Sequence, residues 1–165
     1  MTDDRPNSTD RSSPGTPTGH RPGPGTVPVL DDQGIFELLR TSRRIAVVGA
    51  SSNPARPSFG VFRTMLAAGY ECLPVNPNET TVLGVPAVAT LAEAAKSGPI
   101  DIVDVFRRPE MTEDVARDAV AIGARALWLQ LGVINWDSAR IAAEGGLAVV
   151  MDRCTAIEIR RLPRG

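Results

Sequence analysis

The segment IAVVGASSNPARPS at residues 45–58 gives the clearest indication of how this chain folds. Residues 45–48 are all apolar, which is typical of a strand buried on both faces of a parallel sheet. A turn of small residues begins at Gly49 and leads into an expected helix at 58–68. A strand followed by a short turn and a helix predicts the start of an alternating β/α fold.

The same alternation continues along the rest of the chain. Strand-length apolar runs lie at 45–48, 72–75, 100–106, 126–131 and 147–151. Expected helices lie around 35–39 and at 58–68, 91–95, 111–122 and 135–143. A weaker edge strand is expected at 81–88, where Gly84 and Pro86 interrupt the pattern. This order predicts an α/β fold: a Rossmann-like, doubly wound, mainly parallel sheet with helices on both faces.

The first part of the chain differs from the rest in composition. The chain has 165 residues, which is enough for about one domain. Residues 1–28 hold six of the 14 prolines and four of the 15 glycines, and they contain no Leu, Ile or Phe. Such a segment buries too little apolar surface to offset the entropy lost on ordering. We therefore expect a disordered Pro/Gly-rich tail at 1–28 and one folded domain at 29–165.

Composition and charge exclude several classes of protein. With 18 Lys+Arg against 19 Asp+Glu, the net charge of −1 argues against a nucleic-acid binder, which needs an excess of basic residues. No apolar run reaches the length of about 18 residues that a membrane span needs, and we expect no secretory signal, because no apolar segment follows a basic start. Two cysteines are too few for a disulfide framework, so we expect a cytoplasmic protein.

Two residue counts limit the chemistry further. The only histidine is His20, in the expected tail, and the only lysine is Lys96. The folded part therefore offers no Ser-His-Asp or Cys-His arrangement, no phosphohistidine and no metal cluster containing histidine. We predict no catalytic residue and no metal site.

Ligands of open parallel sheets bind at the carboxyl ends of the strands, where the strand order reverses. We expect strands 45–48 and 100–106 to flank that crevice. The turn after the first strand offers backbone N–H groups, a helix start and Arg56, and the strand at 100–106 leads directly to Arg107 and Arg108. Together with Arg153, after the last strand, these guanidinium groups are expected to converge on phosphate. The alternatives are a tight turn without a ligand and, for the paired arginines, a solvated loop.

The turn after the strand at 72–75 argues against NAD. Dinucleotide-binding domains place an acidic residue at that strand end, whereas this chain has Asn76 there. Glu71 precedes the strand and Glu79 lies beyond the turn. The first turn also lacks the G-x-G-x-x-G spacing, since only Gly49 is in place.

The later strand ends carry polar side chains inside or beside apolar runs. Gln130 and Gly132 are placed for polar contact with a bound molecule, whereas Trp128 is expected in the core. Asp104 lies inside an apolar run, which favours a buried, hydrogen-bonded structural role. Cys154 is either a partly exposed thiol or an inert core residue, and Cys72 is expected in the core.

Taken in order, five segments resemble the stand-alone CoA-binding Rossmann proteins. That group is similar to the CoA-binding domain of the succinyl-CoA synthetase alpha subunit. The segments are IAVVGASSNPARPS (45–58), GYECLPVNPNETTVLGVPAV (69–88), DIVDVFRRPE (101–110), ALWLQLGVIN (126–135) and GLAVVMDRC (146–154). They cover most of residues 29–160, and their occurrence in one order makes the resemblance specific.

The resemblance implies a nucleotide ligand, coenzyme A, and a set of residues that contact it. By position, the phosphate-contacting turn is Ser51, Ser52, Asn53, Pro54 and Arg56; the second turn is Asn76 and Pro77; and the strand end that meets CoA is Leu129, Gln130 and Leu131. Many members carry a lysine after the Asn-Pro pair, where this chain has Asn78. Ligase activity is not expected, because the synthetases use a phosphorylated histidine in a second domain.

The function expected from residues and resemblance together is non-covalent binding of CoA or an acyl-CoA. The predicted binding residues are Gly49, Ser51, Ser52, Asn53, Pro54, Arg56, Asn76, Pro77, Arg107, Arg108, Leu129, Gln130, Leu131 and Gly132. The protein would act as a carrier, sensor or accessory module without catalysis of its own, and Cys154 would be able to form a mixed disulfide with the CoA thiol. The alternatives are an NAD(P)- or nucleotide-dependent enzyme and a pure interaction module; no protein partner is identified.

Overall fold

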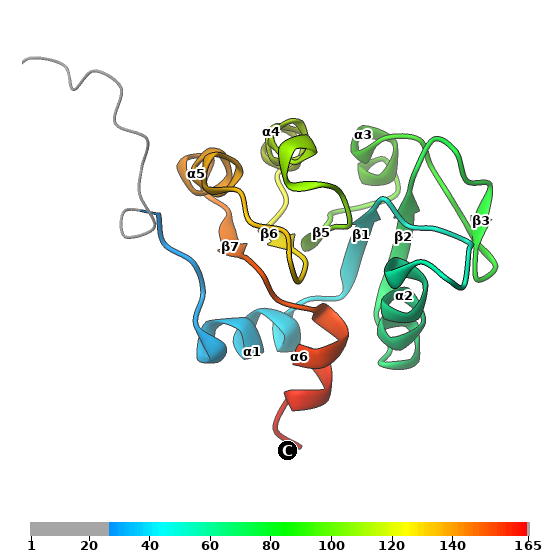
Figure 1. The fold of residues 1–165 in the computed structure, drawn as a ribbon, viewed down its shortest axis with the longest axis horizontal. Coiled ribbons are helices and arrows are strands. Elements are labelled where there is room, and N and C mark those ends of the chain that lie inside the picture. Colours follow the sequence, from blue (N-terminus) through cyan, green and yellow to red (C-terminus); the bar gives the residue numbers. More distant parts are fainter. Residues whose placement is uncertain (1–26, 165) are drawn as a thin grey trace, which may run out of the picture.

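A five-stranded parallel sheet forms the centre of the molecule and confirms the predicted fold class (Figure 1). The computed structural model describes residues 27–164. The strand order is β2-β1-β5-β6-β7, with bounds β1 Arg44–Val48, β2 Glu71–Val75, β5 Ile102–Val105, β6 Ala126–Leu129 and β7 Ala148–Val150. In the parallel register, Ile45 of β1 lies between Cys72 of β2 and Ile102 of β5. The chain therefore extends the sheet in both directions from β1.

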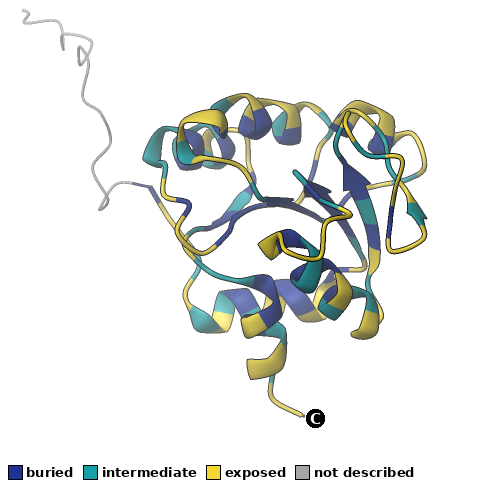
Figure 2. Ribbon diagram, turned by 45° about the vertical axis from the view of Figure 1, so that its right-hand side comes forward, coloured by how far each residue is buried: buried dark blue, intermediate teal, exposed yellow. Residues whose placement is uncertain are grey.

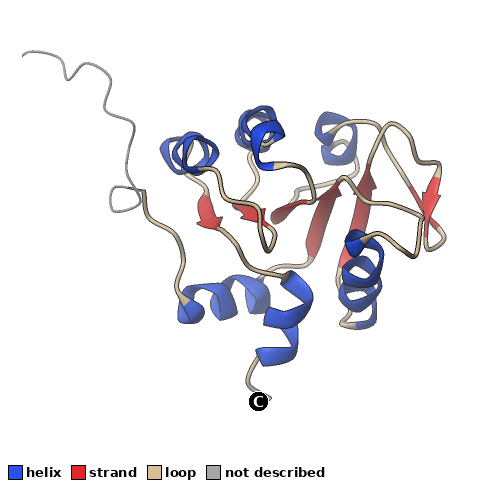
Figure 3. Cartoon of the chain, in the orientation of Figure 1, coloured by secondary structure: helices blue, strands red, loops and turns tan. Residues whose placement is uncertain are grey.

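Helices cover both faces of this sheet (Figure 3). One face carries α1 Asp32–Thr41, α2 Pro57–Ala67 and α6 Thr155–Arg161. The other carries α3 Leu91–Ala95, α4 Glu113–Ala121, preceded by a short 3-10 helix η1 at Pro109–Met111, and α5 Trp136–Glu144. The sheet is therefore buried on both sides, as its nearly continuous apolar strands predict.

Alternate residues of each strand pack into two separate cores, because successive side chains of a strand point to opposite faces. In β5, Val103 and Val105 pack under α3, α4 and α5, whereas Ile102 packs toward α1, α2 and α6. Trp128 is fully buried on the second face, as expected. The strands are almost entirely buried in Figure 2, and exposed residues lie on the outer sides of the helices.

The segment expected as an edge strand, 81–88, is instead mainly a small hairpin. β3 Thr81–Val82 and β4 Val85–Pro86 pair antiparallel with each other and form their own sheet. Leu83 and Gly84 between them have φ angles of 47° and 78°, which fit a tight two-residue hairpin turn. Only Val88 reaches the main sheet, through a parallel bridge to Val75.

Both ends of the described chain contain packed structure that the sequence patterns did not predict. Helix α6 was not among the expected elements, and it packs against α1 and α2. Val27 is only 6% exposed and belongs to the core on the face of α3, α4 and α5, so packing begins two residues before the expected domain start. Most of the predicted tail, residues 1–26, lies outside the described residues. Within residues 27–164, every helix is too short or too polar to cross a lipid bilayer.

Candidate functional site

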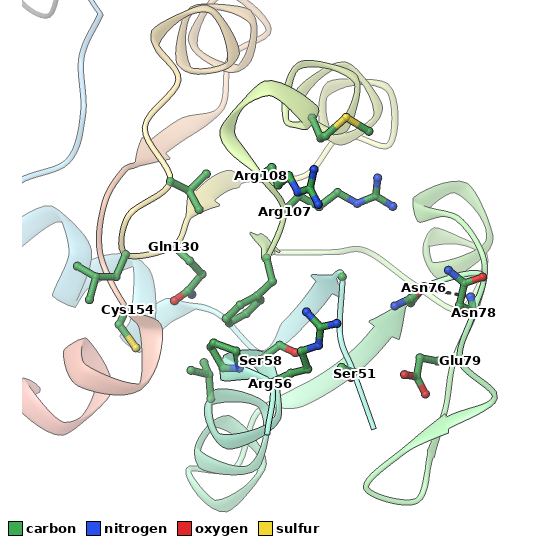
Figure 4. Close-up of a pocket in the computed structure, with 17 residues that line it drawn as sticks. Ser51, Arg56, Ser58, Asn76, Asn78, Glu79, Arg107, Arg108, Gln130 and Cys154 are labelled. Atoms are coloured by element: carbon green, nitrogen blue, oxygen red, sulfur yellow. Dashed lines mark hydrogen bonds between the residues drawn. The ribbon is translucent and has the colours of Figure 1, made fainter. Parts of the chain in front are cut away.

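A cavity of about 1010 Å³ lies beyond the carboxyl ends of the strands (Figure 4). Its walls come from the turns that follow β1, β2, β5 and β6, together with the start of α2. β1 and β5 are neighbours, but the chain leaves them toward opposite edges of the sheet. The cavity therefore lies at the point where the strand order reverses, which is the ordinary ligand position in this fold class.

The turn after β1 brings backbone close to the cavity. Gly49 has a φ of 84°, and a β-carbon at this position would collide with the carbonyl oxygen of Phe106. Asn53 shapes the rest of the turn, because its Oδ1 accepts the N–H of Ala55 at 2.9 Å and its carbonyl accepts the N–H of Arg56 at 3.0 Å. This turn ends at Arg56, which lies directly before α2 and lines the cavity together with Ser58.

The turn after β2 is fastened to the turn after β1. Asn76 Nδ2 donates to the carbonyl of Ala50 at 2.9 Å, and Asn76 Oδ1 accepts the N–H of Asn78 at 3.0 Å. Glu79 Oε1 accepts the backbone N–H of Ser52 at 3.1 Å. Hydrogen bonds from Ser52, and a weaker one from the Ser51 side chain, lower the pKa of Glu79 below its ordinary value. Glu79 is therefore ionised at neutral pH and lines the cavity.

Three arginines give the cavity most of its charge. Arg56 comes from the first turn, and Arg107 and Arg108 follow β5. Among residues 27–164, no carboxylate forms a salt bridge with any of the three. Figure 4 shows them in the middle of the cavity, with Asn78 and Glu79 at one end and Gln130 and Cys154 at the other. Such guanidinium groups are well suited to a phosphorylated ligand.

A buried polar cluster supports the end of the cavity at Gln130. Gln130 is 4% exposed, and its Nε2 donates to Asp104 Oδ1 at 2.5 Å and to Thr155 Oγ1 at 2.9 Å. The Thr155 hydroxyl donates to Asp104 Oδ2 at 3.0 Å. Burial raises the pKa of Asp104 to about 7, although both hydrogen bonds oppose that rise. The predicted buried and hydrogen-bonded state of Asp104 is confirmed.

The two cysteines lie in different surroundings. Cys154 is partly exposed and lines the cavity. Cys72 is 2% exposed within β2. Burial, and secondarily the charges of Asp104 and Glu71, raises the pKa of Cys72 to about 12. The prediction that Cys72 lies in the core is confirmed, and Cys154 is the thiol that a bound ligand would meet.

Comparison with known proteins identifies the family. The model of a family described as a CoA binding domain matches residues 43–160, which is most of the chain. The chain belongs to this CoA-binding family. The predicted resemblance to stand-alone CoA-binding Rossmann proteins is thereby confirmed.

Several relatives match this CoA-binding family member over most of their own length. The uncharacterized protein YneT of Bacillus subtilis (strain 168) is 45% identical over 123 residues, which are 74% of this chain and 90% of YneT. A solved structure of a Thermus thermophilus protein is 36% identical, covers 81% of this chain and all of its own, and has a TM-score of 0.76. A hypothetical protein from Pyrococcus horikoshii OT3 is 34% identical, with 81% and 92% coverage and a TM-score of 0.77.

A more distant structure shows the fold alone. It is a dinucleotide-forming acetyl-coenzyme A synthetase of Ca. Korarchaeum cryptofilum, which is 20% identical with a TM-score of 0.61. The match covers 71% of this chain and 28% of the synthetase. The fold of this family member therefore also occurs as one part of a much longer chain.

More than half of the predicted binding residues of this family member line the cavity. They are Gly49, Ser51, Arg56, Asn76, Arg107, Arg108, Gln130 and Leu131.

The other predicted residues lie beside the cavity or away from it. Ser52, Asn53 and Pro54 belong to the first turn without lining the cavity, and Pro77 lines a smaller cavity of about 170 Å³. Leu129 is fully buried in the core of the sheet. The backbone N–H of Gly132 donates to Asp152 Oδ1 at 2.7 Å.

The expectation that Arg153 joins the other arginines is wrong. Its Nη1 lies 2.8 Å from Asp32 Oδ1 in α1 and 3.4 Å from Glu158 Oε1 in α6. The guanidinium pairs with these carboxylates of α1 and α6, and Arg153 does not line the cavity.

Sequence reasoning missed several residues that line the cavity. Among them are Ser58 and Val61 at the start of α2, Phe106 after β5, and Glu79. Helical spacing places Ser58 and Val61 on one face of α2, which was a usable indication. The position of Glu79 had no such local indication, because its partner Ser52 lies 27 positions away.

Proposed function

We propose that this protein binds coenzyme A or an acyl-CoA non-covalently in the cavity described above. The observation that carries the proposal is the cluster of Arg56, Arg107 and Arg108, which line one cavity and form no salt bridge within residues 27–164. CoA carries three phosphate groups and is therefore strongly anionic. Membership of a CoA-binding family supports the same ligand.

We also propose that the protein acts as a carrier, sensor or accessory module without catalysis of its own. General acid–base catalysis is most efficient when the pKa of the group lies near the working pH. Glu79 is the only carboxylate among the described residues that line the cavity, and its pKa is lowered rather than raised toward neutrality. The unpaired thiols Cys72 and Cys154 favour a reducing, cytoplasmic location.

One observation favours an NAD(P)- or nucleotide-dependent enzyme as the second candidate. Glu79 follows β2 and lines the cavity, although the sequence had suggested that it lies too far beyond the turn. A carboxylate after the second strand holds the ribose hydroxyl in NAD-binding domains. NAD binding at an affinity comparable to that of CoA would favour this second function.

Calorimetric titration with CoA, acetyl-CoA, NAD and ATP tests the proposal. We expect CoA and acetyl-CoA to bind more tightly than NAD and ATP. Arg56→Ala and Arg107→Ala should each weaken CoA binding roughly ten- to a hundredfold, since each removes a charge-assisted contact to phosphate. Arg140→Ala is the matched control, because Arg140 pairs with Glu144 on α5 and does not line the cavity. Absence of CoA binding would overturn the function, and unchanged affinity in both variants would overturn the placement of the phosphates.

A further inference from the structure

Glu79 brings a negative charge into a cavity whose other charged side chains are arginines. It belongs to the loop between β2 and β3, and its side chain crosses to the turn after β1. There its Oε1 accepts the backbone N–H of Ser52 at 3.1 Å. Hydrogen bonds from Ser52 and Ser51 stabilise the ionised form. The carboxylate is therefore held by the turn itself, and it forms no salt bridge with an arginine among residues 27–164.

A phosphate bound at this turn would compete with Glu79, which lines the cavity, for the backbone N–H of Ser52, which does not. An ionised carboxylate and a phosphate are both anionic acceptors that bind backbone N–H groups at short turns. The N–H of Ser52 already has Glu79 as its acceptor. Two like charges at neighbouring positions also repel each other, most strongly where the surroundings exclude water.

The loop that carries Glu79 allows its side chain to leave. Glu79 is only half-buried, and the adjacent Asn78 and Thr80 are exposed. The backbone of the turn is held independently, because the N–H of Glu79 donates to the carbonyl of Asn76 at 3.2 Å and the N–H of Asn78 donates to Asn76 Oδ1. A rotation of the Glu79 side chain toward solvent would therefore free the Ser52 amide without unfolding the loop.

We propose that Glu79 is an internal anion that occupies the phosphate-binding turn of the ligand-free protein and must be displaced when a phosphorylated ligand binds. It is thus a specificity-determining residue that lowers the affinity for phosphate at this turn. The role rests on the proposed function in one respect, namely that a phosphate of the ligand lies at the turn after β1. The ligand chemistry concerned is a diphosphate or phosphate ester, and a neutral pantetheine portion is not affected.

Binding titrations of Glu79→Gln and Glu79→Ala test this inference in the full chain. Three probes are used: CoA, inorganic pyrophosphate and pantetheine, which lacks phosphate. Removal of the charge should tighten the binding of CoA and pyrophosphate by roughly three- to tenfold and leave pantetheine unchanged. Glu79→Ala should have at least the effect of Glu79→Gln, because it also removes the competing acceptor.

Glu110→Gln is the matched control for a general change in charge. Glu110 is exposed within η1, two positions after Arg108, and it does not line the cavity. Its substitution removes one negative charge at the same edge of the sheet. We expect its affinity for CoA and pyrophosphate to stay within about twofold of the unmodified protein. An equal gain in Glu110→Gln would show a nonspecific charge effect and would overturn the role of Glu79.

The other outcomes separate this inference from the proposed function. If CoA binds and neither Glu79 variant binds it more tightly, the inference fails and the function stands. Weaker binding in both variants, with NAD affected in the same way, would instead make Glu79 a ligand contact. If CoA does not bind but the variants bind pyrophosphate more tightly, the function fails and the inference stands. Absence of binding by all proteins to all three probes overturns both.

Discussion

Chemical labelling of the Cys154 and Cys72 thiols measures which of the two the cavity makes accessible to a reagent. Cys154 lines the cavity, whereas Cys72 is 2% exposed and its pKa is raised to about 12. A thiol reagent attacks the thiolate, so we expect Cys154 to be labelled in the native protein and Cys72 only after unfolding. Excess CoA should slow the labelling of Cys154. Equal labelling rates for the two cysteines, measured by peptide mass spectrometry, would contradict the structure.

Asp104 makes the stability of the protein depend on pH. Burial raises its pKa from 3.8 to about 7, so between these values the folded protein holds a proton that the unfolded chain has released. The stabilisation that this retained proton adds to the folded state is fully present below pH 3.8 and is lost as the pH rises to about 7. Compared with Asp104→Asn, the unmodified protein should therefore lose stability with rising pH, by on the order of 1 kcal/mol per pH unit at most within this window. Urea unfolding of both proteins across the window measures the difference, and a difference independent of pH would contradict the assignment.

The position of a charged residue can be predicted from sequence where a strand end alone determines it. Arg107 and Arg108 follow β5 closely, Arg56 ends the turn that follows β1, and all three line the predicted crevice. Arg153 also follows a strand, but its guanidinium donates to Asp32 Oδ1 at 2.8 Å. Asp32 lies 121 positions earlier in the chain. Glu79 reaches the cavity through a comparable long-range contact. A sequence pattern shows where a strand ends, whereas the direction of a long side chain depends on distant partners.

The turn between β1 and α2 depends on the absence of a side chain at Gly49. Its φ is 84°, and an added β-carbon would collide with the carbonyl oxygen of Phe106. Gly49→Ala should lower the free energy of unfolding by roughly 1–3 kcal/mol or more, and weaken ligand binding because both residues line the cavity. Urea unfolding and CoA titration measure the two effects.

Gly60→Ala is the corresponding control within α2. Gly60 has ordinary helical conformation, and nothing lies within 4 Å of an added β-carbon. This substitution should raise the free energy of unfolding by up to about 1 kcal/mol, because alanine favours the helix and restricts the unfolded chain. Similar losses in both variants would show that the conformation of Gly49 is not the cause.

The elements that the sequence predicts well are those with a strong local pattern. All five main strands and the helices α1 to α5 lie close to their expected positions, because apolar runs and amphipathic periodicity are visible within one segment. Helix α6 was missed. It is seven residues long, and its place depends on ion pairs of Glu158 and Arg161 with residues of other segments and on packing against α1 and α2. The hairpin at 81–86 was missed because its turn requires a positive φ at Leu83, which a sequence rarely indicates.

The cavity joins parts of the chain that meet only after folding. Its walls come from residues 49–61, 76–79, 106–111, 130–133 and Cys154. The parallel strands bring these segments to one edge of the sheet, and each strand connects to the next through a long crossover. The position of the cavity could therefore be predicted from the strand order expected for the fold. Its detailed composition follows from packing that no single segment determines.

Because the walls come from distant segments, a ligand in the cavity should stabilise the entire fold. A ligand at about 100 times its Kd raises the free energy of unfolding by about 2.7 kcal/mol when it binds only the folded state. For a domain of this size, we expect CoA to raise the Tm by roughly 5–11 °C. Pantetheine at the same concentration should raise it much less, since it offers no phosphate to Arg56, Arg107 and Arg108. Scanning calorimetry measures the Tm with each compound. An equal rise in Tm with pantetheine and with CoA would show that the arginines do not hold the phosphates.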